Sequence, residues 1–347
     1  GLINPCIGSI NSIGESLTNI LWAPLENGIK SVSLSANWMW PCGNEGEDSR
    51  LYEAVDACSK FAIELGINIP TGKDSLSMVQ KYDKLKVKSP GTVIISASGH
   101  CNDIRKVVKP VLNKNSGSIY YINLSFDDFK LGGSSFAQTL NKIGSESPEI
   151  KNPKKFRESF NLIQNLISDS NILSGHDISS GGLITCLLEM CFSSNSIGLN
   201  IDLTEIGCRD SIKLLLSENS GIIIQSNKDL VREFSSIGVK CIKIGNINKN
   251  GVLEIKNFEN NFSFDINKYR DIWFSTSRDF DLKQTKNNKA IERYNNYKNQ
   301  PLKFKFPKGF DGNNISNNSN KNIKAAVIRE KGSNSEREMA FMMSLAG

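Results

Sequence analysis

The sequence predicts a mixed α/β fold, because short apolar runs typical of strands alternate with segments of helical periodicity. The runs at 198–202 and 222–225 illustrate the strands, and the segments 49–65 and 154–168 illustrate the helices. The chain has 347 residues, enough for two or three domains that each bury a core. An all-helical bundle and an all-β sandwich would not show this alternation.

The first third of the chain is expected to contain two helices and several strands. A helix is predicted over 8–22, where Ile13, Leu17 and Leu21 recur on one side. Gly66 is expected to end the second helix. The other elements expected here are a strand over 30–37, a loop over 38–48, the helix over 49–65, and strands over 67–69 and 93–98.

A second block is expected to start near Gly117 with a strand over 118–124. A Gly132–Gly133 loop follows, and the apolar positions Phe136, Leu140 and Ile143 predict a helix after it. The remaining elements expected are a helix over 154–168, a strand with a polar motif over 172–182, a helix to Phe192, and strands over 198–202 and 222–225.

From Lys256 the periodicity weakens, so 256–322 is expected to be an irregular segment that ends in a linker. Residues 311–322 are too poor in apolar side chains to pack. A strand over 325–329, a turn over 330–335 and a helix over 336–345 would then begin a new βα unit. Since the sequence opens on Gly1 and stops soon after that helix begins, we expect an internal piece of a longer polypeptide.

Composition excludes several classes of protein. The net charge is +6, but the lysines are scattered and form no basic stripe, so no nucleic-acid partner is predicted. No apolar run reaches membrane-spanning length. The eight cysteines show no C-x-x-C spacing, and Cys58, Cys186 and Cys191 lie in apolar helical patterns as small buried side chains. We therefore expect reduced thiols and a cytoplasmic location.

The most informative stretch is 174–183, where a short strand leads into a glycine-opened helix. Asp177 offers a hard oxygen ligand for Mg²⁺, and Ser179 and Ser180 offer hydrogen-bond donors. Gly181 and Gly182 would let a phosphate approach the first N–H groups of the helix. The alternative is that Asp-x-Ser is an ordinary helix N-cap, and the segment taken by itself favours that alternative.

Glu15 and Asn19 are four residues apart on the first predicted helix, which places both side chains on one face. A carboxylate and an amide oxygen suit Mg²⁺, which needs few protein ligands because it keeps water and bridges phosphates. Asp177 could complete the set from another domain. The alternative is a solvated helix face with a polar pair.

Three further features have ordinary explanations. Residues 71–75 (TGKDS) contain a Gly-Lys step but lack the rest of a phosphate loop, although Lys73 could still neutralise a phosphate. His176 could act as a general base or simply bond to the backbone at a strand end. Trp38 and Trp40 are expected to pack in a core or an interface.

Five segments in one order resemble large, single-chain phosphoribosylformylglycinamidine synthase, also called formylglycinamide ribonucleotide amidotransferase. The resemblance covers nearly the whole chain, and it is strongest over 15–80 and 170–192 and weakest over 256–322. The segments are 33–48 (SLSANWMWPCGNEGED), 52–55, 70–78 (PTGKDSLSM), 176–183 (HDISSGGL) and 326–339 (AVIREKGSNSEREM).

That resemblance implies domains like those of aminoimidazole ribonucleotide synthetase, arranged in two pseudo-symmetric halves and followed by a class I glutaminase domain. Here 1–112 would be the N-type domain of the second half and 117–255 its C-type domain. The segment 256–322 would be irregular and contain the linker, and 323–347 would open the glutaminase domain.

The family couples ATP cleavage to the conversion of formylglycinamide ribonucleotide to formylglycinamidine ribonucleotide in purine biosynthesis, with ammonia from glutamine. The implied ligands are ATP or ADP, Mg²⁺, formylglycinamide ribonucleotide and glutamine, and the rest of the same polypeptide is the implied partner. The chain alone is expected to be inactive, because the family's catalytic His, Cys, His and Glu belong to parts not present in it.

Carried over by position, Glu15, Asn19 and Asp177 match Mg²⁺ ligands and Ser179 matches a nucleotide contact. The family has a carboxylate where this chain has Ser180, which leaves the strength of the metal or helix-terminus interaction open. Two alternatives remain: a structural half that holds ADP and Mg²⁺ without taking part in catalysis, or another ATP-dependent member of the same superfamily.

Overall fold

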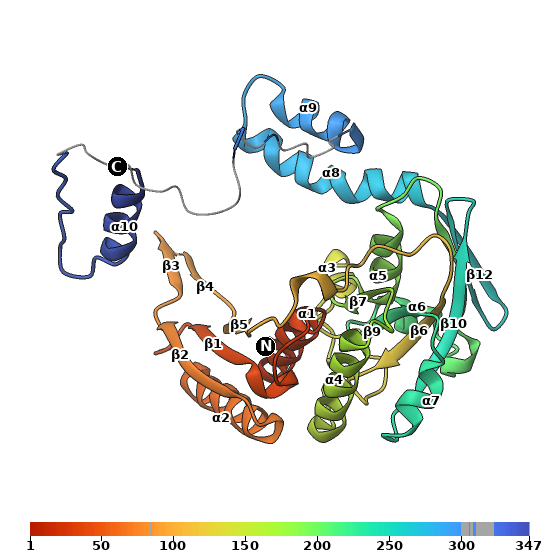
Figure 1. The fold of residues 1–347 in the computed structure, drawn as a ribbon. Coiled ribbons are helices and arrows are strands. Elements are labelled where there is room, and N and C mark those ends of the chain that lie inside the picture. The colour runs from red at the N-terminus through yellow and green to blue at the C-terminus, as the bar shows by residue number, and fades with distance from the viewer. Residues whose placement is uncertain (84, 300–304, 306–307, 310–322, 347) are drawn as a thin grey trace. The chain divides into compact units, whose positions relative to one another are not determined.

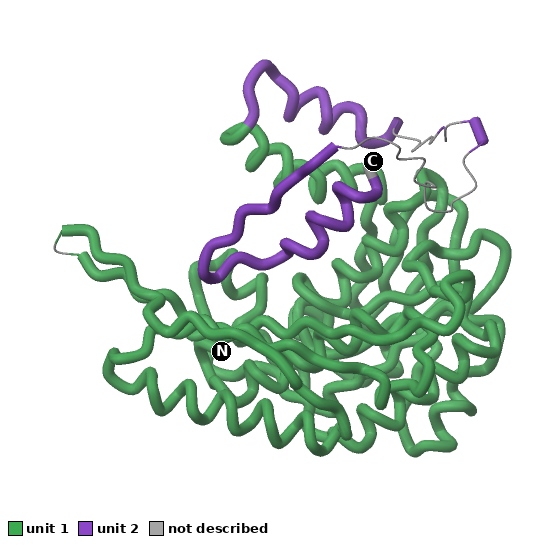
Figure 2. The backbone as a smooth tube through the Cα atoms, turned by 60° about the vertical axis from the view of Figure 1, so that its left-hand side comes forward, with its two compact units in different colours: residues 1–284 green, residues 285–347 purple. Residues whose placement is uncertain are grey.

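The computed structural model describes residues 1–83, 85–299, 305, 308–309 and 323–346. The chain divides into two compact units, residues 1–284 and 285–347, shown in separate colours in Figure 2. Each unit is described by itself. Both sheets and most of the helices belong to the first unit, which confirms the predicted mixed α/β fold.

Unit 1 contains a three-stranded sheet, a seven-stranded sheet and a two-stranded hairpin. The small sheet lies before the boundary expected at 112–117, and the large sheet lies after it (Figure 1). The small sheet has the order β2 (Asn68–Ser75), β1 (Ser33–Met39), β5 (Thr92–Ser98), and the hairpin is β3 (Val79–Tyr82) with β4 (Leu85–Lys88). The large sheet has the order β12 (Asn260–Asp265), β11 (Val252–Asn257), β8 (Gly198–Asp202), β10 (Cys241–Asn248), β6 (Ser118–Asn123), β9 (Gly221–Ser226), β7 (Ser174–Ile178).

The helices of unit 1 pack on these sheets. α1 contacts both α2 and β5, so it packs against the small sheet. Gly66, at φ +73°, ends α2 as its sequence predicted. The helices are α1 (Pro5–Ile20), α2 (Glu47–Leu65), α3 (Ser135–Thr139), α4 (Pro153–Ser168), α5 (Gly182–Cys191), α6 (Ser211–Leu216), α7 (Leu230–Ser235) and α8 (Ile266–Gln284), with short 3₁₀ turns η1 (Gly28–Ser31), η2 (Ile104–Lys106) and η3 (Thr204–Ile206).

Two hydrophobic cores lie on opposite faces of the large sheet. In β6, Tyr120 and Ile122 belong to one core, and Ile119 and Tyr121 belong to the other, as the two-residue period of a strand requires. The first core also contains Leu17 of α1 and residues of α2 and α4, so it joins the parts of the chain before and after 112–117. The second core lies under α5 and α6.

Three predictions for unit 1 differ in kind or in length from the structure. The strand predicted over 67–69 extends to Ser75, so the TGKDS segment is strand and not loop. The helix after the Gly-Gly loop is only five residues long, and Leu140 and Ile143, which predicted a longer one, are exposed. The segment from 256, expected to be irregular, contains β12 and the 19-residue helix α8.

In unit 2, α9 (Lys289–Asn296), η4 (Tyr297–Asn299) and α10 (Glu336–Ala346) are formed. α10 confirms the helix predicted over 336–345. The strand predicted over 325–329 is not formed: these residues have no regular secondary structure, and they are exposed. The linker predicted over 311–322 lies outside the described residues.

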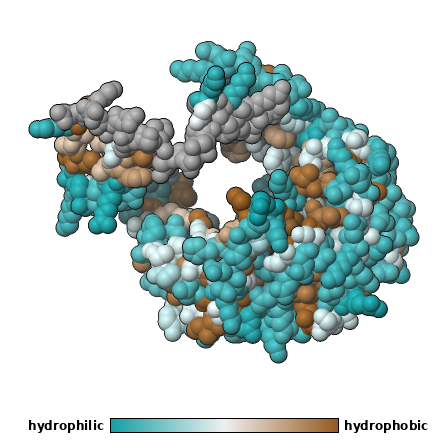
Figure 3. All heavy atoms as spheres, in the orientation of Figure 1, coloured by the Kyte–Doolittle hydropathy of each residue, from teal (hydrophilic) through white to brown (hydrophobic). Residues whose placement is uncertain are grey.

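The surface and the cysteines can be compared with what the composition predicted. Figure 3 shows a visible face that is mostly hydrophilic, with hydrophobic residues in separate patches. Within the described part of the chain, no helix combines the length and apolar character needed to cross a bilayer. All eight cysteines are unpaired, and Cys58, Cys186 and Cys191 are buried as predicted.

A buried ion-pair cluster holds the loop after β6. The Asp127 carboxylate lies 2.7 Å from Lys130 Nζ and 2.6 Å from Lys151 Nζ. It also accepts hydrogen bonds from the backbone N–H groups of Asp128 and Glu149. Burial by itself would raise the pKa of Asp127, but these donors lower it below the ordinary value of 3.8.

We expect Asp127→Asn to lower the free energy of unfolding at pH 7 by about 2–4 kcal/mol, because it breaks a buried, hydrogen-bonded charge cluster. A carboxylate with a lowered pKa stabilises the fold above its unfolded-state pKa, and this contribution is lost as the pH falls through the folded-state pKa. The difference in the free energy of unfolding between the wild type and Asp127→Asn should therefore become smaller below pH 3.8. Urea unfolding at several pH values measures it.

The control for this prediction is Asp56→Asn, which removes an exposed pair with Lys60 on α2. That change should cost under about 0.5 kcal/mol. Equal losses in the two variants would show that the Asp127 cluster does not stabilise the fold.

Candidate functional site

A cleft of about 760 Å³ runs along α1 in unit 1. Its walls come from α1, from β5, from the loop at 132–133 with residues 147–148, and from the turn between β7 and α5. Segments on both sides of the 112–117 boundary thus meet at one cavity. Most of the polar residues that line it are Ser, Asn or Glu.

The α1 wall follows from the helical period. Ile13 and Leu17 are fully buried in the first core, whereas Glu15 and Asn19 point from the opposite side of the helix into the cleft. Both are exposed side chains. The structure therefore places the predicted pair on one face of α1, and that face lines a cavity.

The opposite wall is the turn after β7. β7 is an edge strand that pairs with β9, and it delivers Asp177 in a buried position, 6% exposed. Two residues later, the Ser179 hydroxyl donates a hydrogen bond to Glu15 Oε1. Residues 164 positions apart in sequence are thus in direct contact. Glu15, Asn19 and Ser179 line the same cleft, whereas the buried Asp177 is not among the residues that line it.

The two glycines are required at the start of α5. Gly181 and Gly182 have φ of +87° and +75°, values that other residues rarely adopt. A side chain on Gly182 would also meet the carbonyl oxygens of Leu215 and Ser217, each 2.7 Å from the added carbon. The tight turn that aims Ser179 at the cleft therefore depends on this pair.

The N–H groups of Gly181 and Gly182, at the start of α5, already have acceptors within the protein. Gly181 N donates to Glu218 Oε1 at 2.8 Å, and Gly182 N donates to the Ser179 carbonyl at 3.0 Å. The same Glu218 oxygen accepts from Ser135 N at 2.8 Å. Glu218 therefore supplies a carboxylate at the helix start, where Ser180 replaces the acidic residue of the resembled family.

The carboxylates make the cleft electronegative. The cleft walls displace solvent from the Glu15 carboxylate and raise its pKa, and the charges of Asp177 and Glu218 raise it further, against the hydrogen bond from Ser179. For Asp177, burial alone would raise the pKa, but contact with His176 lowers it below its ordinary value. The site therefore favours a cation.

His176 is held between two carboxylates. Its Nδ1 lies 3.3 Å from Asp177 Oδ1, an ion-pair contact without hydrogen-bond alignment, and its Nε2 lies 3.2 Å from Glu189 Oε2. Although burial would lower the pKa of His176, these carboxylates raise it to about 9. A ring with so high a pKa is a poor general base at neutral pH, and its ion-pair contacts are with the side chains of Asp177 and Glu189.

A divalent ion fits the donors that are present. No Lys, Arg or His side chain lines the described walls of the cleft, so nothing there would neutralise a phosphate directly. Carboxylate and amide oxygens are the ligands that Mg²⁺ prefers. Among the described residues, no three His, Cys, Asp or Glu side chains alone form a metal-holding group. Glu15 and Asp177 would need the Asn19 amide and ligand oxygens to complete a shell.

The other predicted features lie outside the cleft walls. Lys73 belongs to β2, pairs in register with Asn37 of β1, and donates to Ser75 Oγ at 2.7 Å, so TGKDS is not a phosphate loop. Trp40 is buried and Trp38 packs against the first core, which confirms their predicted packing role.

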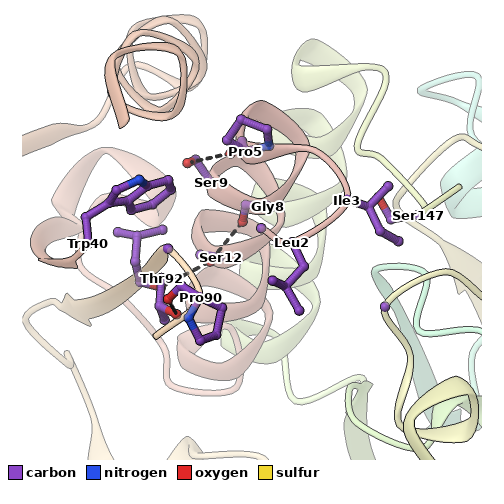
Figure 4. Close-up of a pocket in the computed structure, with 14 residues that line it drawn as sticks. Leu2, Ile3, Pro5, Gly8, Ser9, Ser12, Trp40, Pro90, Thr92 and Ser147 are labelled. Carbon is purple, nitrogen blue, oxygen red and sulfur yellow. Dashed lines mark hydrogen bonds between the residues drawn. The ribbon is translucent and has the colours of Figure 1, made fainter. Parts of the chain in front are cut away.

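A smaller hollow of about 250 Å³ adjoins the cleft at the N-terminal end of α1. Figure 4 shows Trp40 and Pro90 beside the helix residues Pro5 and Ser9. Gly8 and Ser12 line both cavities, so the hollow extends the space along α1.

Sequence reasoning missed Glu218 and Glu189. Glu218 follows a short helix, and its local sequence gives no sign that its side chain reaches two distant N–H groups. Glu189 did leave a signal, because it is the single charged residue in the apolar helix α5. A lone carboxylate in such a helix needs a partner.

Comparison with known proteins matches two parts of the chain to domain families. Residues 1–100 match the FGAR-AT PurM_N-like domain, and residues 126–256 match the AIR synthase related protein, C-terminal domain. The two matched ranges contain all of the predicted site residues.

Curated relatives match over the whole chain. A probable phosphoribosylformylglycinamidine synthase, chloroplastic/mitochondrial, from Arabidopsis thaliana is 35% identical over 361 residues, covering 100% of this chain and 25% of that protein. Phosphoribosylformylglycinamidine synthase from Homo sapiens is 30% identical, with 100% and 26% covered. A probable one from Caenorhabditis elegans is 35% identical, with 100% and 28% covered. The chain therefore spans about a quarter of the length of these relatives.

Solved structures share the fold at low sequence identity. T. maritima PurL complexed with FGAR has a TM-score of 0.59 at 10% identity, and covers 78% of this chain and 44% of its own. Hydrogenase maturation protein HypE in complex with ATP has a TM-score of 0.53 at 14% identity, with 74% and 78% covered. These likenesses confirm the predicted synthetase-like architecture of unit 1.

Proposed function

The chain is homologous along its whole length to phosphoribosylformylglycinamidine synthases, and from this premise we propose that it forms a nucleotide-binding part of such an enzyme. The reaction proposed for the whole enzyme is the ATP- and glutamine-dependent conversion of formylglycinamide ribonucleotide to formylglycinamidine ribonucleotide. The proposed role of residues 1–284 is to hold ATP or ADP through Mg²⁺ in the cleft along α1.

The observation that supports this proposal is the contact between Ser179 and Glu15 across the cleft. It brings the α1 pair and the β7–α5 turn to one place, as a shared ion requires. The electronegative walls give the second support. A nucleotide carries negative phosphates, and without basic side chains on the described walls it needs a divalent cation to bind there.

Each predicted residue has a role in this proposal. Glu15, Asn19 and Asp177 would hold Mg²⁺, which would supply positive charge to bridge phosphate oxygens. The Ser179 hydroxyl, now donated to Glu15, would turn to a phosphate oxygen once the ion neutralises that carboxylate. Glu218 would hold the start of α5 in place through the hydrogen bond that it accepts from Gly181 N.

One observation favours a structural role for this nucleotide over a catalytic one. His176 lies near the site, but it is a cation engaged by two carboxylates and does not line the cleft. No Lys, His or Cys is among the residues that line the described walls, and the two carboxylates there, Glu15 and Glu218, serve in this proposal as a metal ligand and as the acceptor of the Gly181 N–H. The alternative proposal is therefore a half that holds ADP and Mg²⁺ to stabilise the fold.

Several finer predictions stay proposals. Residues 323–347 are proposed to begin a glutaminase domain. The helix α10 supports this proposal, although the strand predicted before it is not formed. Glutamine and formylglycinamide ribonucleotide are proposed substrates of the whole enzyme, with the rest of the same polypeptide as partner and no nucleic acid. The cytoplasm is the proposed compartment, although the Arabidopsis relative is named as chloroplastic/mitochondrial.

Calorimetric titration of the 347-residue chain with ADP tests the site. We expect binding in the presence of Mg²⁺, and an affinity lower by about 100-fold or more in EDTA, since the charge-assisted contacts of the phosphates would be lost. Equal affinity in EDTA would refute the metal-bridged site, and no binding in either condition would refute the nucleotide site.

A further inference from the structure

A line of side-chain contacts runs from α8 to the candidate metal ligand Asp177. Trp273 Nε1 on α8 donates a hydrogen bond to Glu189 Oε1 at 2.9 Å. The other oxygen of that carboxylate, Oε2, lies 3.2 Å from His176 Nε2. The second ring nitrogen of His176 lies 3.3 Å from Asp177 Oδ1. Four side chains from three elements are thus connected end to end.

The far end of this line is fixed to the body of unit 1. Arg270, one turn before Trp273, is 6% exposed and donates to the Phe192 carbonyl and to Asn195 Oδ1, at 2.9 and 2.6 Å. The Trp273 ring packs edge-on against Phe192, with 6.1 Å between ring centroids. α8 is therefore tied to the end of α5, and the indole N–H has a set position relative to Glu189.

Each carboxylate oxygen of Glu189 contacts a different partner. A movement of Trp273 would therefore affect His176 through Glu189, and the reverse. Its side chain is 27% exposed and stands on an otherwise uncharged helix. A carboxylate in such a position stays there only where its partners offset the cost of desolvation. The partners here are the Trp273 indole and the His176 ring, and that ring in turn contacts Asp177.

We propose that Glu189 and Trp273 are positioning residues for Asp177, acting through His176 to hold one carboxylate oxygen and so orient the other toward the ion. This inference rests on the proposed Mg²⁺ site. Neither residue lines the cleft. Outer partners of this kind set the orientation of a metal-binding carboxylate, and their loss lowers metal affinity about 10–100-fold.

The test uses Mn²⁺, which accepts the same octahedral oxygen ligands as Mg²⁺ and has an electron paramagnetic resonance signal. The free Mn²⁺ signal is titrated with the 347-residue chain in saturating ADP. Glu189→Leu should weaken Mn²⁺ binding by about 10-fold or more. Glu189→Gln can still accept from Trp273, so it should recover part of the loss. Trp273→Phe keeps a packed ring without the N–H, and it should weaken binding several-fold.

The matched control is Glu254→Gln on β11, which removes the same charge from an exposed carboxylate bonded to Ser263. It should bind Mn²⁺ like the wild type. The bound-ion spectrum adds a readout beyond affinity, since a displaced carboxylate changes the symmetry of the ligand field.

The outcomes separate this inference from the function on which it rests. If Asp177→Asn loses Mn²⁺ but both Glu189→Leu and Trp273→Phe bind it with wild-type affinity and spectrum, the positioning role is refuted and the site stands. If Asp177→Asn also binds normally, the proposed site itself fails. Should Glu189→Leu not fold, Trp273→Phe at a half-exposed position still decides the question.

Discussion

Replacing Asp177 with asparagine is expected to weaken binding of ADP with Mg²⁺ by about 100-fold, because one negative ligand of the ion is lost at a buried position. The substitution also leaves the His176 cation with Glu189 as its remaining carboxylate partner. Calorimetry in saturating Mg²⁺ measures the loss. The stability of the ligand-free protein should change less than the affinity, since the substitution also removes the repulsion between Asp177 and the Glu15 carboxylate.

The control for Asp177 is Asp202→Asn on β8, which changes an exposed carboxylate paired with Lys256 and remote from the cleft. It should leave ADP affinity unchanged. An Asp177→Asn protein that binds ADP and Mg²⁺ as tightly as the wild type would remove this residue from the ligand set.

Gly175→Ala is expected to lower the free energy of unfolding by about 3 kcal/mol, because its new methyl group would overlap the ring of Trp22. Trp22 is 9% exposed and belongs to the first core, so the ring has little room to move. The strain would fall on β7, two residues before Asp177. Chemical denaturation measures the loss, and ADP titration of the folded protein measures its effect on the site.

A double-mutant cycle with Trp22→Phe tests the cause. Phenylalanine lacks the ring atoms that the alanine methyl would meet, so the two changes together should cost less than the sum of the single costs. Additive losses would place the origin of the destabilisation elsewhere.

The fold was predictable from the sequence where local pattern and tertiary packing agree. α2 and α4 have one apolar face, and they formed within two residues of their predicted bounds. α8 was missed because its sequence is polar, with only Ile266 and Arg270 buried. Its position depends on partners such as Phe192 and Glu189, which a local pattern cannot reveal.

The candidate site was predictable in its residues and not in its geometry. The four-residue spacing of Glu15 and Asn19 fixed their common face, but only the fold shows that Ser179 reaches that face. The α5 start was expected to offer free N–H groups to a phosphate. One of these groups, the Gly181 N–H, donates to Glu218, a residue distant in sequence that also accepts from Ser135 N, and no local pattern predicts that contact.

The two sides of α1 have different roles, so packing on the buried side affects the position of the candidate ligands on the other side. Ile13 and Leu17 are fully buried between the small sheet and the large one, while Glu15 and Asn19 project from the other side of the same helix. A shift or tilt of α1 would therefore also move the side-chain oxygens of Glu15 and Asn19. The width of the gap that an ion must bridge is thus set by the fit of apolar side chains that never meet the ion.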